Sequence, residues 1–329
     1  SCNFHKKGEY ILSQLTVAAS PHFRSGNSTA KIMLDVIIAL CPALIAGVIV
    51  FGWRALLVVA VCILSCIVFE YLSRLVMKRD NTIGDLSAVV TGMLLAFNLP
   101  VTIPLWMAVI GCFIAIVIVK QLFGGIGQNF ANPAITARIV LMISFTTQMT
   151  HWVQPFFYQN SGVDAITTAT PLTMIATPDK LPSMLEMFLG AKGGCIGEVS
   201  GLALLIGGLY LVIKRVISPT VPLVFIGTVF VFSALFGAQP VYQLLSGGLM
   251  LGAIFMATDY STSPITEWGK VIFGFGCGFI TVMIRVFGSY PEGVSFSILF
   301  MNILVPYIDK ATVSRPVGEK KQSKPAKQE

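Results

Sequence analysis

Charged side chains are scarce in this sequence. They make up 11% of its 329 residues, whereas soluble domains carry roughly 25%. Hydrophobic residues make up 55% of the chain, and its mean hydropathy is +0.82. The apolar residues also occur in blocks as long as a membrane-spanning helix. This composition excludes an ordinary soluble enzyme and predicts an all-α integral membrane protein.

Groups that hold metals or nucleic acids are equally poorly represented. The three histidines show no metal-ligand spacing, and none of the seven cysteines lies in a CxxC motif. Cys62 and Cys66 share one face of a helix, but two thiols without further ligands are a weak metal signal, so we interpret them as helix-packing residues. The net charge is +7, yet no basic stripe is interleaved with aromatic residues, so no nucleic-acid partner is expected.

The apolar blocks predict about ten transmembrane helices, in two sets on either side of a long polar interval. The predicted spans are 32–51, 55–77, 86–99, 103–123, 133–149, 195–213, 221–236, 242–257, 271–287 and 294–308. The chain then divides into an N-terminal segment (1–31), a first five-helix repeat (32–149), the polar interval (150–193), a second five-helix repeat (194–310) and a disordered tail rich in Lys, Gln and Pro (311–329).

The basic residues indicate how the chain crosses the membrane. If the N-terminus is cytoplasmic, most of the 22 lysines and arginines fall in segments on the cytoplasmic side, in agreement with the positive-inside rule. The C-terminus is then also cytoplasmic, and the polar interval faces outward. Arg138 falls within a span, where the sequence assigns it no partner.

The two halves of the chain align with each other at a constant offset of 164 residues. Residues 100–102 match 264–266, and residues 123–124 match 287–288. Few positions are identical, so the matching hydropathy carries the prediction of a repeat. Because each half has an odd number of spans, the second half is inserted upside-down, which gives two inverted five-helix repeats.

The third and eighth spans occupy matching positions and are short or interrupted. The third is about 21 Å long as a helix, against a bilayer core of about 30 Å. It contains Ser87, Thr91 and Gly92, and the eighth span contains Ser-Gly-Gly at 246–248. Such spans predict a site near the membrane midplane, through which ions would move. The alternative is that both are short helices buried by their neighbours.

Two polar loops on the predicted cytoplasmic side offer ligand-binding groups. The glycine-rich loop 120–134 contains Asn129 and Asn132, and the segment 257–264 contains Asp259. No strand precedes the glycines, so they do not form a dinucleotide-binding fingerprint. The alternatives are a simple turn between two helices for the first loop and a cap of the following helix for Asp259.

Three further charged residues lie in or at the edge of spans. Glu198 enters the sixth span near the outer surface, where an acidic group is a functional candidate, although capping of the helix N-terminus is the simpler role. Glu70 and Arg74 lie four residues apart on the second span and are predicted to form an ion pair near the inner surface.

The polar interval contains the stretch Asp164-Ala-Ile-Thr-Thr-Ala-Thr-Pro-Leu172. Thr170 stands among small residues immediately before a proline, which disfavours helix at that position. We therefore expect an extended, accessible hydroxyl group to which an enzyme could attach another group.

Taken together, these motifs resemble the family that contains the D subunit of the Rnf complex and, more distantly, the B subunit of the sodium-pumping NADH:quinone reductase. The resemblance covers nearly the whole chain and rests on the combination and order of the motifs. The motifs lie at 20–22, 85–88, 91–92, 124–134, 164–172, 196–198, 257–259 and 290–293.

In that family a flavin transferase joins FMN through its phosphate to the threonine of a Ser-Gly-Ala-Thr-like motif. The resemblance places this covalent FMN on Thr170, in the segment that begins at Asp164. Thr168 replaces the usual glycine and, together with Thr167, adds two hydroxyl groups close to the modified one. The transferase acts outside the cytoplasm, in agreement with the predicted topology.

The resemblance also implies a non-covalent riboflavin on the cytoplasmic side, at Asn129, Asn132 and Asp259. The implied fold is the inverted five-helix repeat of the urea transporters. The implied protein is a membrane component of a prokaryotic complex that transfers electrons from reduced ferredoxin to NAD⁺ and pumps Na⁺ or H⁺ across the cytoplasmic (inner) membrane. The flavins would carry the electron relay, so catalytic side chains and metal ligands are not expected.

The expected partners are Rnf subunits A, B, C, E and G, the flavin transferase, and Na⁺ or H⁺. The alternative is a solute channel of the urea-transporter type with no redox role, which the inverted repeat fits equally well. Such a channel would not explain the threonine-rich outer loop or the Asn and Asp loops.

Overall fold

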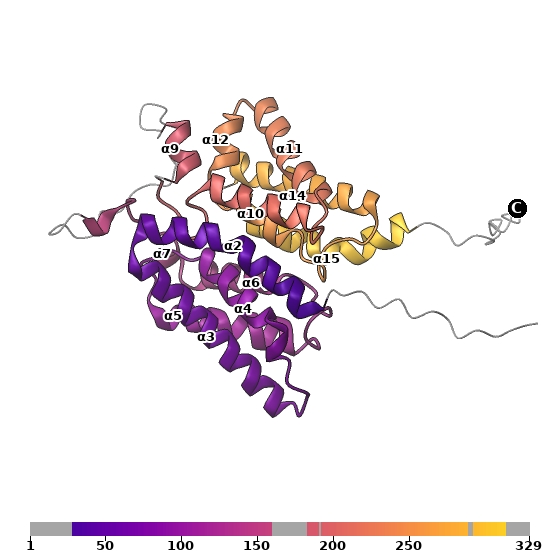
Figure 1. Ribbon diagram of the computed structural model, residues 1–329. Helices are drawn as coiled ribbons and strands as arrows, with labels where there is room; N and C mark the ends of the chain where they lie inside the picture. The colour runs from indigo at the N-terminus through magenta and orange to yellow at the C-terminus, as the bar shows by residue number, and fades with distance from the viewer. Residues whose placement is uncertain (1–27, 160–182, 191, 289–291, 314–329) are drawn as a thin grey trace, which may run out of the picture.

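Helices form every regular element in the part of the chain that the structure describes, and they follow the predicted order (Figure 1). The computed structural model describes residues 28–159, 183–190, 192–288 and 292–313. The four residues of the predicted flavin-bearing stretch lie outside these ranges: Asp164, Thr167, Thr168 and Thr170.

The helices of the first half coincide with the first five predicted spans. They are α2 (Thr29–Phe51), α3 (Trp53–Val76), α4 (Ser87–Phe97), α5 (Leu105–Phe113), its π-helical continuation η2 (Ile114–Gln121), and α6 (Pro133–Ser144). Three shorter elements accompany them, namely η1 (Ile83–Asp85), α7 (Thr146–Met149) and η3 (Phe157–Gln159).

The helices of the second half follow the remaining predicted spans, except that residues 195–200 of the sixth predicted span are not helical. Long helices are α10 (Gly201–Ile213), α11 (Thr220–Leu235), α14 (Glu267–Phe287) and α15 (Val294–Thr312). The eighth span consists of α12 (Pro240–Leu245), α13 (Leu249–Leu251) and the π-helix η5 (Gly252–Met256). The short helix α9 (Met184–Leu189) precedes α10.

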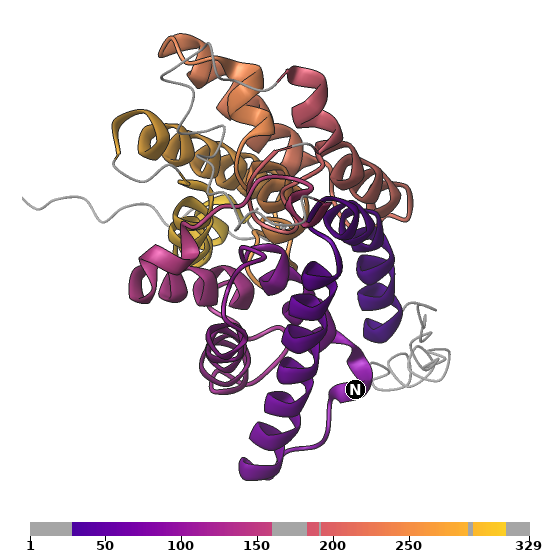
Figure 2. The same ribbon diagram turned by 90° about the vertical axis from the view of Figure 1, so that its left-hand side faces the viewer.

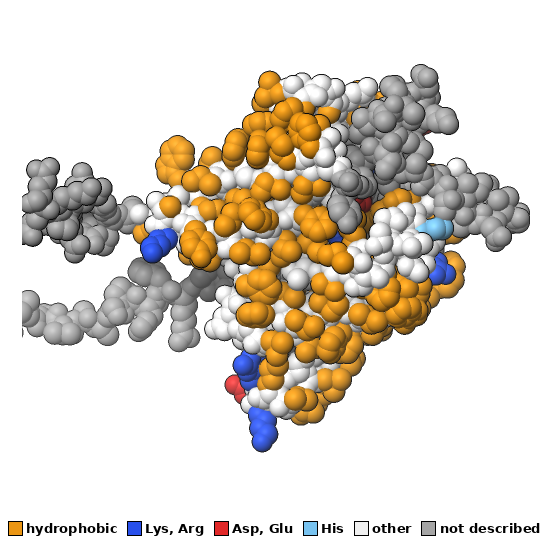
Figure 3. All heavy atoms as spheres, turned by 180° about the vertical axis from the view of Figure 1, so that it is seen from behind, with side chains coloured by type: hydrophobic (Ala, Val, Ile, Leu, Met, Phe, Trp, Pro, Cys, Tyr) orange, Lys and Arg blue, Asp and Glu red, His pale blue; other side chains and the backbone are white. Residues whose placement is uncertain are grey.

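The lengths and surfaces of these helices suit a membrane. Helices α2, α3, α14 and α15 are long and apolar enough to cross one, and five shorter apolar helices accompany them. Hydrophobic side chains cover most of the face in Figure 3, and Lys and Arg lie mostly at its edges. Trp53, Trp106 and Trp268 are exposed at helix ends, as interfacial tryptophans are. The protein is therefore a multi-pass helical membrane protein.

Local sequence signals explain where α2 begins and where it meets α3. Oγ of Ser28 accepts a hydrogen bond from the backbone N–H of Lys31 (3.3 Å) and so caps α2. Gly52 has φ of 76°, a left-handed conformation that glycine adopts without strain, and α3 follows α2 with no other linking residue.

The two halves pack against each other through helices at matching positions. The first-half helices, indigo to magenta in Figures 1 and 2, gather beside the red to yellow helices of the second half. Helix α2 packs on α10, and α6 packs on α15. The α2–α10 contact needs a glycine, because a Cβ atom at Gly207 would lie 2.1 Å from the carbonyl oxygen of Ala39. The first helix of one half thus meets the first helix of the other, and the last meets the last.

The third span is short, as predicted, but it is not interrupted. Helix α4 runs continuously through Thr91 and Gly92, and Oγ1 of Thr91 donates to the carbonyl oxygen of Ser87 (2.9 Å) within the helix. A Cβ atom at Gly92 would lie 2.9 Å from the carbonyl oxygen of Cys62, so this glycine lets α4 approach α3. The predicted interruption was wrong because small residues in membrane helices also serve close packing. Cys62 and Cys66 are buried in α3, as packing residues are.

The eighth span is interrupted where the sequence predicted. Helix α12 ends at Leu245 and α13 begins at Leu249. Gly247, between them, has φ of 63°, which a residue with a side chain adopts only at a cost. The chain therefore changes direction inside this span.

Candidate functional site

A cavity of about 490 Å³ lies where the helix ends predicted to share one membrane face come together. Its walls include the first residues of α2 and α4, the end of η2, the loop between η2 and α6, the segment 258–265 and the end of α15. Asn129, Asn132 and Asp259, which the sequence singled out on two separate loops, line this one cavity. Its volume falls within the roughly 300–1,000 Å³ of small-molecule sites.

Asn132 holds the cavity wall together. Its Oδ1 atom accepts hydrogen bonds from the backbone N–H groups of Ala134 (3.0 Å) and Ile135 (3.3 Å), and so caps α6. Its Nδ2 atom donates to the carbonyl oxygen of Met256 (3.3 Å), at the end of η5. These bonds use the side-chain amide for structure, and a contact between Asn132 and a ligand stays a prediction.

Asn129, in the same loop, has an unused hydrogen-bonding group. Its Oδ1 atom is buried and accepts no hydrogen bond from the described residues. A buried acceptor without a partner costs roughly 1–3 kcal/mol. A ligand that donates an N–H or O–H group to this atom would remove that cost, so Asn129 is well suited to bind a ligand.

Asp259 lies in the turn between η5 and α14. Its Oδ2 atom accepts hydrogen bonds from Oγ of Ser261 (3.0 Å) and Oγ1 of Thr262 (3.3 Å). Burial raises the pKa of the Asp259 carboxyl, and these hydrogen bonds oppose the rise. The alternative role as a cap of α14 was wrong, because Oγ1 of Thr266 caps that helix by accepting from the N–H of Gly269 (3.0 Å).

Lys120 adds a buried positive charge to the cavity wall. Its side chain is 2% exposed, and its Nζ atom donates to Oε2 of Glu70 (2.8 Å) and Oγ of Ser87 (2.5 Å). Oε1 of Glu70 accepts a further hydrogen bond from Oγ1 of Thr82 (2.9 Å). The predicted Glu70–Arg74 ion pair was wrong. The spacing of the two residues permits it, but the buried Glu70 carboxylate meets the ammonium group of η2 instead.

From the sequence, Lys120 was interpreted as one of the basic residues on the predicted cytoplasmic side and as the first residue of the loop 120–134. A stronger signal was present, because Lys120 falls inside the predicted span 103–123, and a charged residue inside a span is a functional candidate. Its pairing with Glu70 could not be found from the sequence, which does not show that η2 lies beside α3.

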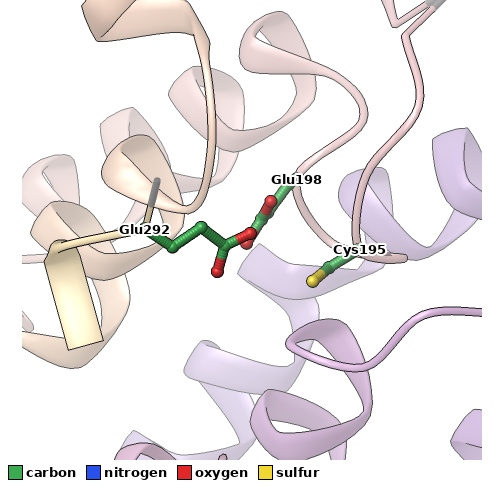
Figure 4. Close-up of side chains that lie close together, drawn as sticks. All are labelled: Cys195, Glu198 and Glu292. Carbon is green, nitrogen blue, oxygen red and sulfur yellow. The ribbon is translucent and has the colours of Figure 1, made fainter. Parts of the chain in front are cut away.

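A second polar cluster is buried between the two halves. Arg138, on α6, donates from Nη1 to Oδ1 of Asn98 (2.7 Å) and from Nη2 to Oε1 of Glu198 (3.2 Å). The same guanidinium group pairs with the carboxylate of Glu292, just before α15. Figure 4 shows Glu198 and Glu292 reaching toward each other from different segments, with Cys195 close by. Arg138 thus has two acidic partners, both from the second half.

Glu198 belongs to a segment that contacts the end of α4 before α10 begins. The backbone N–H of Gly197 donates to the carbonyl oxygen of Phe97 (2.9 Å). Ser200, and not Glu198, caps α10. The simpler role predicted for Glu198 was therefore wrong, because its carboxylate pairs with Arg138 instead.

The break in the eighth span lies against the same cluster. A Cβ atom at Gly248 would lie 2.7 Å from Oε1 of Glu198 and 3.2 Å from Nη1 of Arg138. Lys192 and Arg285 donate hydrogen bonds to carbonyl oxygens at the end of α12, where positive charge is favourable. The end of the third span and the break in the eighth therefore meet at one buried group of ion pairs.

The donor atoms of this cluster do not fit a metal ion. Cys195, Glu198 and Glu292 place three ligand atoms within 4.8 Å of one another. Both carboxylates already bind Arg138, however, and the buried Lys192 and the partly buried Arg285 also lie close to the cluster. A cation would have to displace the guanidinium group and leave it buried without an acidic partner, which is strongly unfavourable.

Comparison with known proteins shows sequence matches along nearly the whole chain. The model of the NQR2, RnfD, RnfE family matches residues 16–318. The D subunit of the Na⁺-translocating ferredoxin:NAD⁺ oxidoreductase complex of Acetobacterium woodii is 49% identical over 318 residues, which cover 95% of this chain and 98% of that protein. The D subunit of the proton-translocating complex of Clostridium ljungdahlii is 44% identical over 315 residues, covering 90% and 94%.

A more distant relative extends the same pattern. The D subunit of the ion-translocating oxidoreductase complex of Stutzerimonas stutzeri is 37% identical over an alignment of 335 positions that covers 91% of this chain and 95% of that protein. Because the family model matches almost from end to end, and the relatives match over nearly their whole lengths, this chain belongs to the NQR2, RnfD, RnfE family.

Proposed function

We propose that the protein is the D subunit of a complex that couples electron transfer from reduced ferredoxin to NAD⁺ with ion translocation across a prokaryotic cytoplasmic membrane. The observation that carries this proposal is the 49% identity to a component of such a complex over 95% of the chain. The protein acts as an electron relay, in which the flavins supply the redox chemistry. Relatives named for Na⁺ and for proton translocation both match, so the ion is Na⁺ or H⁺.

The first cofactor in this proposal is FMN, attached through its phosphate to Thr170. Support comes from the resemblance of the stretch that begins at Asp164 to the flavin-attachment motif of the family. Thr167 and Thr168 are the nearest other hydroxyl groups.

A denaturing gel viewed under ultraviolet light tests the attachment. The protein from cells that contain a flavin transferase should fluoresce, and its intact mass should exceed that of the bare chain by one FMN group. Thr170→Ala should remove both signals, whereas Thr167→Ala and Thr168→Ala should retain them. A fluorescent Thr170→Ala band would assign the flavin to another residue.

The second cofactor is riboflavin, bound without a covalent bond in the cavity. The polar edge of an isoalloxazine ring carries an N–H group between two carbonyl groups. The free acceptor Oδ1 of Asn129 suits the N–H group, and Asp259 offers a further acceptor nearby. Leu94 and Phe255 provide apolar wall for the hydrocarbon end of the ring. In this arrangement Asn132 keeps the wall in place, and the cavity residues orient the ring and exclude water.

The proposed topology is two inverted five-helix repeats with both termini in the cytoplasm. Support comes from the packing of α2 on α10 and α6 on α15, and from the meeting of the predicted cytoplasmic helix ends at one cavity. The riboflavin cavity then faces the cytoplasm, and Thr170 lies on the other side of the membrane.

Cysteines introduced at the exposed residues Asp80 and Gln154 test this topology. A membrane-impermeant maleimide should label Gln154→Cys in intact cells, and it should label Asp80→Cys only after lysis.

The partners of the protein in this proposal are Rnf subunits A, B, C, E and G, together with the flavin transferase that matures it. A non-redox channel of the urea-transporter type has lost its support, because the most similar relatives described above are components of oxidoreductases. Co-purification from membranes tests the assembly. A tagged copy of this chain should bring down the other subunits of the complex together with ferredoxin-dependent NAD⁺ reduction.

A further inference from the structure

Lys120 is a buried cation with a hydrogen-bond donor to spare. An ammonium group carries three N–H donors. Glu70 and Ser87 accept two of them, at 2.8 Å and 2.5 Å. No third acceptor lies within hydrogen-bond distance among the described residues, and Lys120 lines the cavity. The remaining donor is therefore available to a molecule in the cavity.

The local structure fixes the position of this charge. Oγ of Ser87 donates to Oδ1 of Asp85 (2.6 Å), so its lone pairs are directed at Lys120. Oε1 of Glu70 is held by Thr82 (2.9 Å). The ammonium group is thus anchored by two side chains that are themselves anchored, and it cannot swing away when the cavity is filled.

The backbone at Lys120 is also unusual. Lys120 lies in η2, a π-helical continuation of α5, and the wall residue Phe255 lies in the second π-helix, η5. π-Helical turns are rare and are frequently found at functional sites. Two of them contribute side chains to this one cavity.

Stability alone does not account for the Lys120–Glu70 pair. Both side chains are almost completely buried, and a buried ion pair is often no more stabilising than apolar residues of similar size. A contact that only linked α3 to η2 would therefore not need an ammonium group. It would also not need to place that group in the wall of a cavity. The charge is better explained by an interaction with a ligand in the cavity.

We propose that Lys120 is a positioning residue for the flavin of the cavity, with its free N–H bound to a ring carbonyl oxygen beside the N–H group that Asn129 accepts. The spare donor of Lys120 and the spare acceptor of Asn129 match the alternating acceptor and donor groups of that ring edge. This inference rests on the proposed riboflavin site and adds a function to it. A fixed positive charge at this edge favours the electron-rich reduced ring, so Lys120 raises the midpoint potential of the flavin.

Two negative charges act against Lys120. Glu70 binds the ammonium group directly, and Asp259 lies close enough to interact with it. The charge felt by a ligand is therefore the difference between Lys120 and these carboxylates. It follows that removing Lys120 and removing the charge of Glu70 should shift the potential in opposite directions, which a purely structural role would not produce.

The experiment uses the full chain made in cells without a flavin transferase, so that only non-covalent flavin is present. Flavin is released by denaturation and quantified against protein, and its midpoint potential is measured by spectroelectrochemical titration. Lys120→Met should lower the potential and weaken flavin retention about tenfold or more, because it removes a hydrogen bond from a charged donor. Glu70→Gln removes the negative charge but keeps one amide oxygen as an acceptor for Lys120, and its amide nitrogen can donate to Oγ1 of Thr82. It should raise the potential.

Two further variants complete the design. Lys120→Arg keeps the charge and should keep the potential much closer to the wild-type value than Lys120→Met does. Lys270→Met removes a lysine from an exposed pair with Glu267 outside the cavity and should change neither retention nor potential. If Lys120→Met does not fold, the upward shift of Glu70→Gln decides the question.

The outcomes separate the two levels of the proposal. A wild-type chain that releases no flavin would overturn the riboflavin site itself. A chain that holds flavin, with a potential that moves in neither Lys120→Met nor Glu70→Gln, would overturn the role of Lys120 and leave the riboflavin site standing. Opposite shifts in the two variants would support both.

Discussion

Nη2 of Arg138 lies 3.2 Å from Oε1 of Glu198, although the two residues are 60 positions apart in the chain. With Glu292, this contact joins α6 of the first half to two segments of the second half. Arg138→Met would leave two buried carboxylates without their shared partner. We expect it to lower the free energy of unfolding by about 3–5 kcal/mol, measured by thermal or denaturant unfolding in detergent.

The matched control for this prediction is Lys270→Met, which removes one partner of the exposed Lys270–Glu267 pair. Exposed pairs contribute little, so its stability should be close to that of the wild type. An Arg138→Met variant as stable as this control would show that the cluster does not hold the two halves together.

Gly248 tests whether ions pass where the third and eighth spans meet. Gly248→Ala would place a Cβ atom 2.7 Å from Oε1 of Glu198, and overpacking of this kind costs about 1–3 kcal/mol. If the ion pathway runs past this cluster, the variant complex should also translocate less Na⁺ or H⁺ for each electron transferred, measured in membrane vesicles. Gly227→Ala, inside α11 with open space around the new methyl group, should not destabilise the protein and should leave the coupling unchanged. Unchanged coupling in Gly248→Ala would place the pathway elsewhere.

Asn129 and Asn132 stand three residues apart but should respond differently to removal of the side-chain amide. Asn129→Ala deletes an acceptor that has no partner among the described residues, so it should weaken retention of non-covalent flavin without loss of stability. Asn132→Ala deletes the cap of α6 and should lower the free energy of unfolding by about 0.5–2 kcal/mol. Flavin release and melting temperature measure the two effects. Equal losses of stability in both variants would contradict the distinction.

Asp259 should make the stability of the protein depend on pH. Burial raises its pKa above the ordinary value of 3.8, so as pH rises the unfolded chain loses this proton before the folded chain does. The contribution of Asp259 to stability is therefore greatest below the unfolded pKa and is lost as pH rises through the raised folded pKa. Asp259→Asn removes this term and keeps an oxygen acceptor for Ser261 and Thr262.

Melting temperatures measured in detergent between pH 4 and pH 7 check this prediction. The stability of Asp259→Asn relative to the wild type should increase as the pH is raised. A difference that does not vary with pH, or that varies in the opposite direction, would mean that the Asp259 carboxyl does not carry a raised pKa in the folded protein.

The positions of the helices followed closely from the sequence. Blocks of apolar residues of membrane length have few structural alternatives, because backbone groups in a bilayer must pair within the segment. The break at 246–248 was also visible, since Ser-Gly-Gly interrupts an apolar run. Gly92 was misinterpreted because a glycine looks the same in a sequence whether it breaks a helix or lets a neighbouring helix approach.

That this is a helical membrane protein, the order of its spans and its family could all be inferred before any coordinates, because they depend on composition, hydropathy and motifs along one dimension. Which polar groups meet became clear only from the packing of the helices. Lys120 rather than Arg74 pairs with Glu70, and Arg138 pairs with Glu198 and Glu292. The choice of partner for a buried charge depends on which helices lie side by side, and spacing along the chain does not record that.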